Sequence, residues 1–199
     1  MRVLAHVSGD EDMCSGMRAG LDMHSFTGAR MMKIPIEEFL QRRKEKDVPV
    51  VEARQAAKQV GFGIMYGMGV PALAAGLAEQ MRREVTEEEA QKFYDDYLAC
   101  FPGVAAKREW YQDHARRWGF VQTFTGRYRR LGKAKSRSRI ERARAMRQAV
   151  NAPIQGGAHD IVKAAMQKCE NSRKLKELGC TLRIQVHDEF GFSCPKETA

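Results

Sequence analysis

The sequence predicts a mostly helical α+β fold, since helical signals cover most of its 199 residues and strand signals occur in only two short regions. The helical stretches are bounded by N-cap residues and by Gly or Pro stops at the spacing that helices require. The clearest strand lies at residues 181–187, where Leu182, Ile184 and Val186 alternate with polar side chains. The composition, with 43% hydrophobic and 30% charged residues, fits a folded protein with a buried core.

Residues 12–118 are expected to form a series of helices, including an Ala-rich stretch at 53–77 that contains no acidic residue. Gly and Pro should divide this region, because Gly destabilises a helix and Pro lacks the backbone N–H donor. The expected breaks are Gly20, Gly28 and Pro35 in residues 12–47, and Gly67, Gly69 and Pro71 in residues 53–77.

The next two helices have clear ends. Thr86 is a good N-cap residue, and Glu89 three positions later completes a capping box, so a helix should begin there. Pro102-Gly103 should end that helix. A further helix is expected over residues 104–118, and Gly119 should stop it.

The following residues combine a short extended region with two helices. Residues 119–131 are rich in strand formers, and residues 136–150 favour a basic helix. Pro153 and Gly156-Gly157 should break or kink its continuation, after which helix resumes over 161–178.

The chain is expected to close with a β-hairpin. The alternating strand at 181–187 is followed at once by a second short strand, Phe190–Cys194. This order predicts a turn at His187-Asp188-Glu189.

Several classes of protein are excluded by composition. No apolar run approaches the roughly 18–20 residues that a membrane span needs, and the N-terminus lacks the apolar core of a signal peptide. The five cysteines are scattered and include no C-x-x-C pair, which argues against a disulfide scaffold or a zinc ribbon. We therefore expect a cytoplasmic protein, from a cell or acting in a phage host, with no membrane partner.

The positive charge of the chain is concentrated in one block. The formal net charge is +9, and between Lys107 and Arg147 there are 14 basic and 3 acidic residues. Such a block attracts polyanions, of which nucleic acid is the commonest. The alternative is a basic helix that is exposed to solvent and binds no partner. The strong excess of positive charge in this block makes that alternative less favourable than nucleic-acid binding.

One predicted helix carries two cations followed by two aromatic rings at four-residue spacing: Arg54, Lys58, Phe62 and Tyr66. Each step of four turns the helix by only about 40°, so these side chains share one face. The cations could bind a polyphosphate and the rings could support a base or sugar. The alternative is an amphipathic helix with the rings in its core, although Gly61, Gly63 and Gly67 weaken that interpretation.

Two further patterns carry polar chemistry. Asp188 and Glu189 at a hairpin tip could hold a hard cation such as Mg²⁺, although acids are also common in ordinary turns. Arg147, Asn151 and Gln155 again follow four-residue spacing and suit contacts to phosphate and to base edges. On its own, this second pattern favours a polar helix surface.

Taken together, these segments resemble family A (DNA polymerase I-like) DNA polymerases. Residues 54–67, RQAAKQVGFGIMYG, look like motif B of that family, and residues 185–189, QVHDE, resemble motif C. Residues 126–130, GRYRR, and 151–156, NAPIQG, lie between them in the family's order, and residues 2–10 are similar to the stretch after motif A. The resemblance thus covers essentially the whole chain.

The resemblance implies a nucleotide-binding role for five residues. Arg54 and Lys58 would bind the triphosphate of an incoming deoxynucleoside triphosphate, and Lys58 would donate a proton to the leaving pyrophosphate. His24 would help to hold the same phosphates. Phe62 and Tyr66 would pack on the sugar of the nucleotide and on the nascent base pair or template.

The resemblance also implies metal and DNA ligands. Asp188 would bind Mg²⁺, with Glu189 in support, and two Mg²⁺ ions are expected in the complete enzyme. The residues implied to contact the DNA primer–template are Arg127, Arg147, Asn151, Gln155 and His187. Gly61 and Gly69 stand where the family often has Asn and Ser, and are expected to loosen the motif B helix.

By the same resemblance, residues 21–118 would be the fingers, residues 1–20 a palm segment, and residues 119–199 a palm truncated at its C-terminus. The motif A aspartate is expected ahead of Arg2, so the chain alone should not polymerise DNA. Template-directed DNA synthesis would then be the activity of a larger enzyme of which these residues are a fragment, or of a split enzyme in which an upstream polypeptide carries motif A and the thumb. A non-enzymatic nucleic-acid-binding module derived from a polymerase is the alternative.

Overall fold

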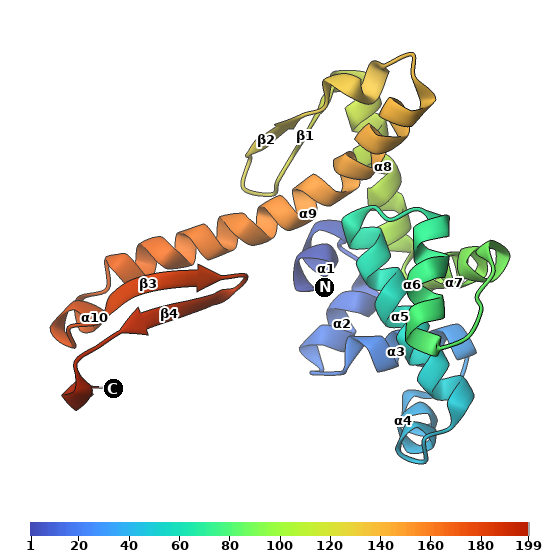
Figure 1. Cartoon of the computed structure of the whole chain (residues 1–199), viewed down its shortest axis with the longest axis horizontal. Helices are drawn as coiled ribbons and strands as arrows, with labels where there is room; N and C mark the ends of the chain where they lie inside the picture. The colour runs from blue at the N-terminus through green and yellow to red at the C-terminus, as the bar shows by residue number, and fades with distance from the viewer. Residues whose placement is uncertain (199) are drawn as a thin grey trace. The chain divides into compact units, whose positions relative to one another are not determined.

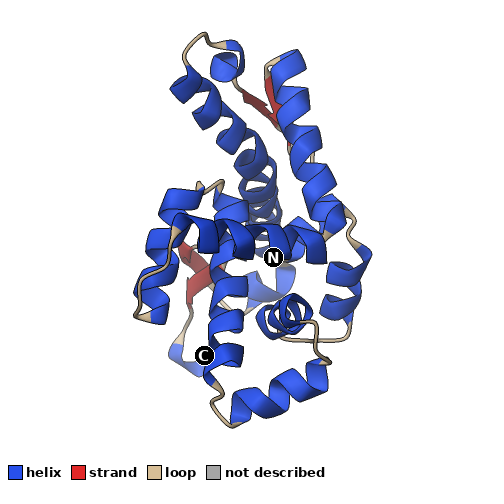
Figure 2. Cartoon of the chain, turned by 90° about the vertical axis from the view of Figure 1, so that its right-hand side faces the viewer, coloured by secondary structure: helices blue, strands red, loops and turns tan. Residues whose placement is uncertain are grey.

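The computed structural model describes residues 1–198, which form two compact units, one over Met1–Gln155 and one from Gly156 onward. Helices predominate, with two small pairs of strands, as the sequence predicts (Figure 2). This division follows packing within the chain, so the assignment of residues 21–118 to fingers and the rest to palm stays a prediction.

Helices make up most of the first unit (Figure 1). They are α1 (Arg2–Ser8), α2 (Glu11–Arg18), α3 (Met23–Met32), α4 (Ile36–Lys44), α5 (Val48–Tyr66), α6 (Val70–Met81), α7 (Glu87–Cys100) and α8 (Pro102–Trp118). A short antiparallel pair, β1 (Phe120–Gln122) and β2 (Tyr128–Arg130), and the 3₁₀ turn η1 (Gly132–Lys135) follow. The long helix α9 (Arg139–Glu170) begins in this unit and continues into the second.

The second unit contains the end of α9, the short helix α10 (Arg173–Glu177) and the hairpin of β3 (Thr181–Val186) and β4 (Glu189–Ser193). The 3₁₀ turn η2 (Lys196–Thr198) completes it, with the Thr198 hydroxyl donating a hydrogen bond to the Leu178 carbonyl at 2.9 Å. The last predicted helix, over 161–178, is therefore divided in the structure. The division falls at Ser172, whose hydroxyl accepts from the Leu175 N–H and caps α10.

Three apolar clusters hold the first unit together. The main one joins α1, α2, α3, α5, α6, α7 and α8 with Val150 and Ile154 of α9. A second joins α8, β1 and η1 to Ala145 and Ala149 of α9. The third places Phe39 of α4 against α3 and α5, so that α3 and α5 pack side by side.

Gly28 and Pro71 do not break helices, contrary to the sequence-based expectation. Gly28 lies inside α3, where the ring of the buried Phe39 occupies the place of a side chain: a Cβ at Gly28 would come 2.7 Å from it. Pro71 lies in the first turn of α6, where its missing N–H would have no helical partner anyway. The interruption between α5 and α6 falls at Gly67–Gly69, as predicted.

The expected break at Pro153 and Gly156-Gly157 is also wrong, because α9 continues through it. Pro153 is fully buried, and its neighbours Val150 and Ile154 lie in the main core. Packing on both sides of the proline therefore offsets the backbone hydrogen bond that its ring removes.

The capping box at Thr86 is half formed. The Thr86 hydroxyl accepts from the Glu89 N–H at 3.2 Å and caps α7 as predicted. The Glu89 carboxylate does not return this bond, because it accepts two hydrogen bonds from Arg83, which also contacts Glu52 of α5. The Glu89 carboxylate of α7 is therefore linked through Arg83 to Glu52 of α5 and does not complete the capping box.

Gly61 of α5 faces a filled space. A Cβ there would lie 3.2 Å from the hydroxyl oxygen of Tyr97, which is fully buried. Burial raises the pKa of Tyr97, whose hydroxyl has no hydrogen-bond partner among residues 1–198. The large ring of Tyr97 thus takes the room that a longer side chain at position 61 would need.

The β3–β4 hairpin exposes part of its apolar face. Ile184 and Val186, whose alternation with polar residues predicted this strand, are 58% and 49% exposed. The turn contains His187 and Asp188, since Val186 pairs with Glu189, so β4 begins one residue earlier than expected. Register shifts between Leu182 and Ile184, and Gly191 makes room for Ile184.

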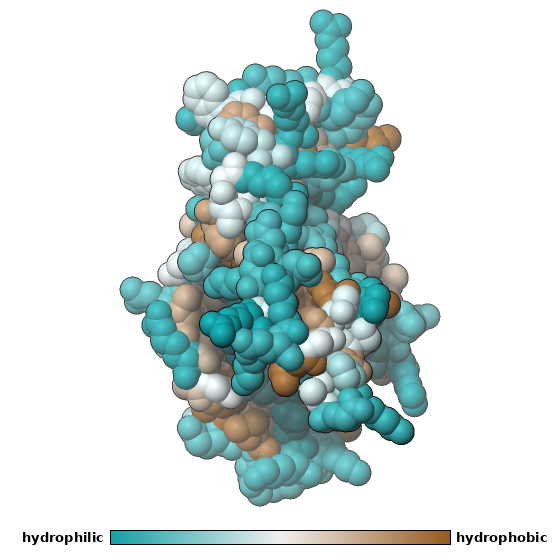
Figure 3. Space-filling model, turned by 90° about the vertical axis from the view of Figure 1, so that its left-hand side faces the viewer, coloured by the Kyte–Doolittle hydropathy of each residue, from teal (hydrophilic) through white to brown (hydrophobic). Residues whose placement is uncertain are grey.

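No helix within residues 1–198 is long and apolar enough to cross a membrane. The face drawn in Figure 3 is largely hydrophilic, with hydrophobic residues in separate patches.

Candidate functional site

The packing of α3 against α5 brings the five predicted nucleotide-binding residues to one place. Asp22 caps the start of α3 and sets His24 in its first turn, beside the face of α5. The ring centroid of His24 lies 6.0 Å from that of Phe62, and the Phe62 and Tyr66 rings are stacked at 6.2 Å. The rings of Phe62 and Tyr66 therefore follow the two cations along α5, and the His24 ring of α3 lies beside Phe62.

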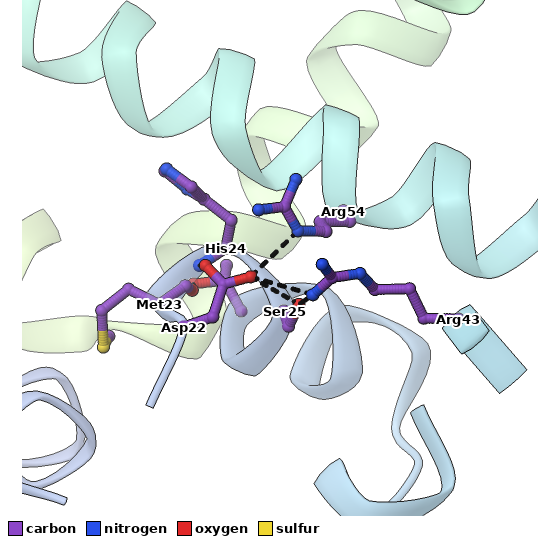
Figure 4. Close-up of polar contacts among 7 residues, drawn as sticks. Asp22, Met23, His24, Ser25, Arg43 and Arg54 are labelled. Atoms are coloured by element: carbon purple, nitrogen blue, oxygen red, sulfur yellow. Dashed lines mark hydrogen bonds and ion pairs between the residues drawn. The ribbon is translucent and has the colours of Figure 1, made fainter. Parts of the chain in front are cut away.

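An ionic network anchors the cationic end of this face. The Asp22 carboxylate accepts hydrogen bonds from Arg54 Nε at 3.0 Å, Arg43 Nη1 at 3.2 Å and the Ser25 hydroxyl at 2.8 Å. Figure 4 shows this carboxylate between the two guanidinium groups, while the His24 ring points away from it. Arg54 is thereby held in position with two of its nitrogens left for a further anion.

The network changes the pKa values of its members. Burial alone would raise the pKa of Asp22, but hydrogen bonds from Ser25, Arg54 and the His24 N–H together lower it below the ordinary value. Burial lowers the pKa of His24, and the charges of Arg54 and Lys58 lower it further against the opposing charge of Asp22. The charges of Arg54 and Lys58 therefore lie close enough to His24 to affect its pKa.

The C-terminal end of α5 is joined to α9. Asn151 Nδ2 donates a 2.8 Å hydrogen bond to the Met65 carbonyl, which satisfies one of the acceptors that a helix end leaves free. Gly67 has a φ of +66°, and a Cβ there would lie 2.9 Å from both the Cβ and the carbonyl oxygen of Arg147. The C-terminal end of α5 therefore contacts α9 at Arg147 and Asn151, two of the residues of the second predicted pattern.

The remaining predicted residues lie elsewhere. Gln155 is half-buried on α9, and Arg127 lies exposed in the loop between β1 and β2, where its N–H donates to the Thr123 hydroxyl. His187, Asp188 and Glu189 belong to the second unit. The structure therefore brings together the residues predicted to bind nucleotide and some of those predicted to bind DNA, while the two carboxylates lie on the hairpin of the second unit.

The hairpin carboxylates suit a hard cation. His187 has a φ of +53° in the turn, and the Gln185 amide donates to its carbonyl oxygen. Asp188 and Glu189 are exposed, and neither forms an ion pair among residues 1–198. Two free carboxylates offer the oxygen ligands that Mg²⁺ prefers. The described residues contain no cluster of three or more carboxylate, His or Cys side chains that could complete a metal site.

Comparison with known families settles the class of the chain. The model of DNA polymerase family A matches residues 1–199 in full. The chain belongs to this family.

Relatives of this family A chain are bacterial enzymes several times its length. It is 38% identical over 199 residues to DNA polymerase I, thermostable, of Thermus aquaticus, and 36% identical over 192 residues to DNA polymerase I of Mycobacterium tuberculosis. It spans 22% and 20% of these curated relatives.

A solved family A structure has the same fold. The chain superimposes on the POL domain of Pol1 from M. smegmatis, in complex with DNA primer–template and dNTP, with a TM-score of 0.80 and 34% identity. The match covers 98% of this chain and 32% of the other. Membership and fold are thus established together, as the motifs predicted.

Two residues of the candidate site were not predicted from the sequence. Asp22 stood in the segment Leu21–His24 but was given no role, although an Asp two residues before a candidate ligand and at a helix start is a recognisable N-cap signal. Arg43 gave no signal, because it lies among other charged residues of α4 and reaches Asp22 only through the tertiary fold.

Proposed function

We propose that these 199 residues supply the nucleotide-binding face and one metal-binding hairpin of a template-directed DNA polymerase. The observation that carries the proposal is the convergence of His24 from α3 with Arg54, Lys58, Phe62 and Tyr66 from α5. Cations at one end of a face and stacked rings at the other match the charged and aromatic ends of a nucleoside triphosphate.

The cations have distinct proposed roles. Arg54, fixed by Asp22, binds the triphosphate through its remaining guanidinium nitrogens. Lys58, one helical turn further, binds the same phosphates and donates a proton to the pyrophosphate that leaves. His24 is favoured in its neutral form by burial, so it contributes a single N–H donor rather than a full charge.

The rings and the hairpin complete the proposed site. Phe62 and the more exposed Tyr66 pack against the sugar and the base of the bound nucleotide. Asp188 and Glu189 would hold Mg²⁺, which when bound stabilises charge on the phosphates during attack by the primer 3′-hydroxyl. Asp188 is a carboxylate without a protein partner among the described residues, which suits this role.

The proposed DNA contacts follow the block of positive charge. Arg127, Arg147, Asn151, Gln155 and His187 would bind the primer–template, with the arginines at phosphates and the amides at base edges. Asn151 has one amide hydrogen committed to Met65, so its oxygen and the second hydrogen stay available.

Polymerisation is proposed to need carboxylates from more than one segment, because two metal ions must be held. Asp188 and Glu189 come from a single turn, so we propose that a motif A aspartate on an upstream polypeptide completes the site in the cytoplasm. The five free cysteines are compatible with that reducing compartment.

Nucleotide binding is the first test. Titration of the chain with a deoxynucleoside triphosphate should show binding that Lys58→Ala and Arg54→Ala each weaken at least about tenfold, as for loss of a charge-assisted contact. Lys174→Ala, which removes an exposed charge from α10, is the matched control and should leave the affinity unchanged.

Primer extension is the second test. With Mg²⁺ and four deoxynucleotides, a mixture of the chain with a polypeptide carrying motif A should extend a primer, and Asp188→Asn should abolish the extension. DNA binding without any nucleotide binding or extension would instead assign the chain to the class of non-enzymatic nucleic-acid-binding modules.

A further inference from the structure

A stripe of cations and aromatic rings runs along one exposed face of α8. Lys107, Trp110, His114 and Arg117 follow spacings of three, four and three residues, which place them on one side of a helix. The Trp110 and His114 rings are stacked at 4.9 Å, and Lys107 Nζ lies 4.4 Å from the Trp110 ring centroid. None of these side chains belongs to the site on α3 and α5.

The stripe continues onto the β1–β2 hairpin, which lies beside α8 (Figure 1). The His114 ring meets the edge of Phe120 at 5.0 Å, and Phe120 lies 5.0 Å from Tyr128. Arg130 pairs opposite Phe120 in the strand register, so it lies on the same face. Four rings, Trp110, His114, Phe120 and Tyr128, thus form a continuous aromatic ladder between Lys107 and Arg130.

The ladder is not required by the core beneath it. Trp110 is 51% and Tyr128 64% exposed, whereas the adjacent Tyr111, Ala115 and Val121 are buried and join α8 to the hairpin. Burying an aromatic ring stabilises a fold, so two rings left this exposed contribute little of that stabilisation. Their exposed area is available to a ligand.

The charge around the ladder selects the class of ligand. The segment from Lys107 to Arg147 has 14 basic and 3 acidic residues. Of the acids on α8, Glu109 lies off the stripe by helical spacing, and the charge of Asp113 at the edge of the stripe is paired with Arg116. A ligand with flat apolar rings and regularly spaced negative charges is complementary to this surface.

We propose that the aromatic ladder binds single-stranded DNA, with unpaired bases stacked on Trp110 and Tyr128 and phosphates near Lys107, Arg117 and Arg130. Exposed rings flanked by cations are the means by which proteins bind single strands without reading sequence. A duplex presents phosphates and has its bases already stacked, so it would not engage the ring faces. The proposal rests on the proposed function for DNA rather than RNA as the ligand.

The two tryptophans of the chain provide the test. Trp118→Phe leaves Trp110 as the only tryptophan, and Trp110→Phe leaves Trp118, which is 67% exposed and has no ring contact within residues 1–198. Titration with an oligothymidylate of roughly 12 nucleotides, a usual site size, should quench Trp110 fluorescence strongly. Trp118, whose ring contacts no ring of the ladder, should be quenched less. Equal quenching of both tryptophans would overturn the proposal.

Affinity measurements make the test independent of one fluorophore. Tyr128→Ala and Trp110→Ala should each weaken oligothymidylate binding at least about fivefold, the lower range for loss of one stacked base. An abasic strand of the same length and charge should bind both variants and the unmodified chain equally. Unchanged oligothymidylate affinity in the variants would overturn the proposal.

These measurements use neither deoxynucleoside triphosphate nor metal ion. A chain that binds single strands through the ladder but fails to bind deoxynucleoside triphosphate would refute the proposed function and leave the ladder. A chain that binds deoxynucleoside triphosphate but does not bind single strands through the ladder would refute only the proposal for the ladder.

Discussion

The Asp22 carboxylate accepts a hydrogen bond from Arg54 Nε at 3.0 Å, so the first cation of the proposed nucleotide-binding face is partly neutralised. This pairing both positions Arg54 and places a negative charge where a triphosphate is proposed to bind. The two effects oppose each other, and one substitution separates them.

Asp22→Asn should raise the affinity for a deoxynucleoside triphosphate by about threefold at low salt, because a repulsive charge beside the phosphates is removed. Asn caps helices as well as Asp does, so α3 should keep its start. Isothermal titration of both chains checks this. A weaker affinity in the variant would mean that positioning of Arg54 by Asp22 outweighs the charge.

His24 should make stability depend on pH. Its pKa in the folded chain is lowered from 6.5, mainly by burial, so the unfolded chain binds a proton at higher pH than the folded chain does. The free energy of unfolding should therefore be fully retained above about pH 6.5 and fall as the pH drops below that value.

Urea unfolding at a series of pH values between 7.5 and 5 checks this dependence. His24→Gln, which cannot be protonated, should flatten the slope in this range. If the slope of the free energy of unfolding against pH were the same in the variant, the pH dependence would arise from titratable groups other than His24. The corresponding effect of Asp22, whose pKa is also lowered, falls below about pH 3.9 and does not overlap.

Gly67→Ala should destabilise the chain by about 1–3 kcal/mol, because the residue has a left-handed backbone and its Cβ would meet the backbone of Arg147 at 2.9 Å. Gly69→Ala is the matched control: its φ is −84° and the nearest atom to its Cβ is 3.8 Å away. Thermal unfolding of the two variants should therefore give clearly different midpoints, and similar midpoints would contradict the contact.

Asn151→Ala should cost about 1–2 kcal/mol of stability, because the Met65 carbonyl loses its side-chain donor in a half-buried position. Asn151→Asp should cost more, since a carboxylate would face the carbonyl oxygen. Chemical denaturation measures both. Equal stability of all three chains would show that water replaces the amide without loss.

The sequence was sufficient for the fold class and for placing Arg54, Lys58, Phe62 and Tyr66 on one helix face, because a four-residue spacing fixes a helix face before any tertiary contact forms. Thr86, Gly67 and Gly119 marked real helix ends for the same local reason. Pro153 misled, since its effect on α9 is decided by the buried neighbours of the helix rather than by the residue itself.

The parts of the site that escaped prediction depend on distant packing. Arg43 reaches Asp22 from 21 residues away, and Asn151 reaches Met65 from 86 residues away. No spacing rule connects such pairs. Likewise, Ile184 and Val186 have the alternation of a half-buried strand, but that pattern does not state what covers the strand.

The contact of Gly67 with Arg147 imposes an asymmetric constraint on sequence variation. The crowding at position 67 comes from the Cα, Cβ and carbonyl oxygen of Arg147, atoms that every residue except glycine also has. In a saturation library scored for folding, position 67 should therefore accept almost nothing but glycine, while position 147 tolerates many side chains. A selection for DNA synthesis would narrow position 147 as well, and the difference between the two libraries would separate what the arginine side chain does from what its backbone does.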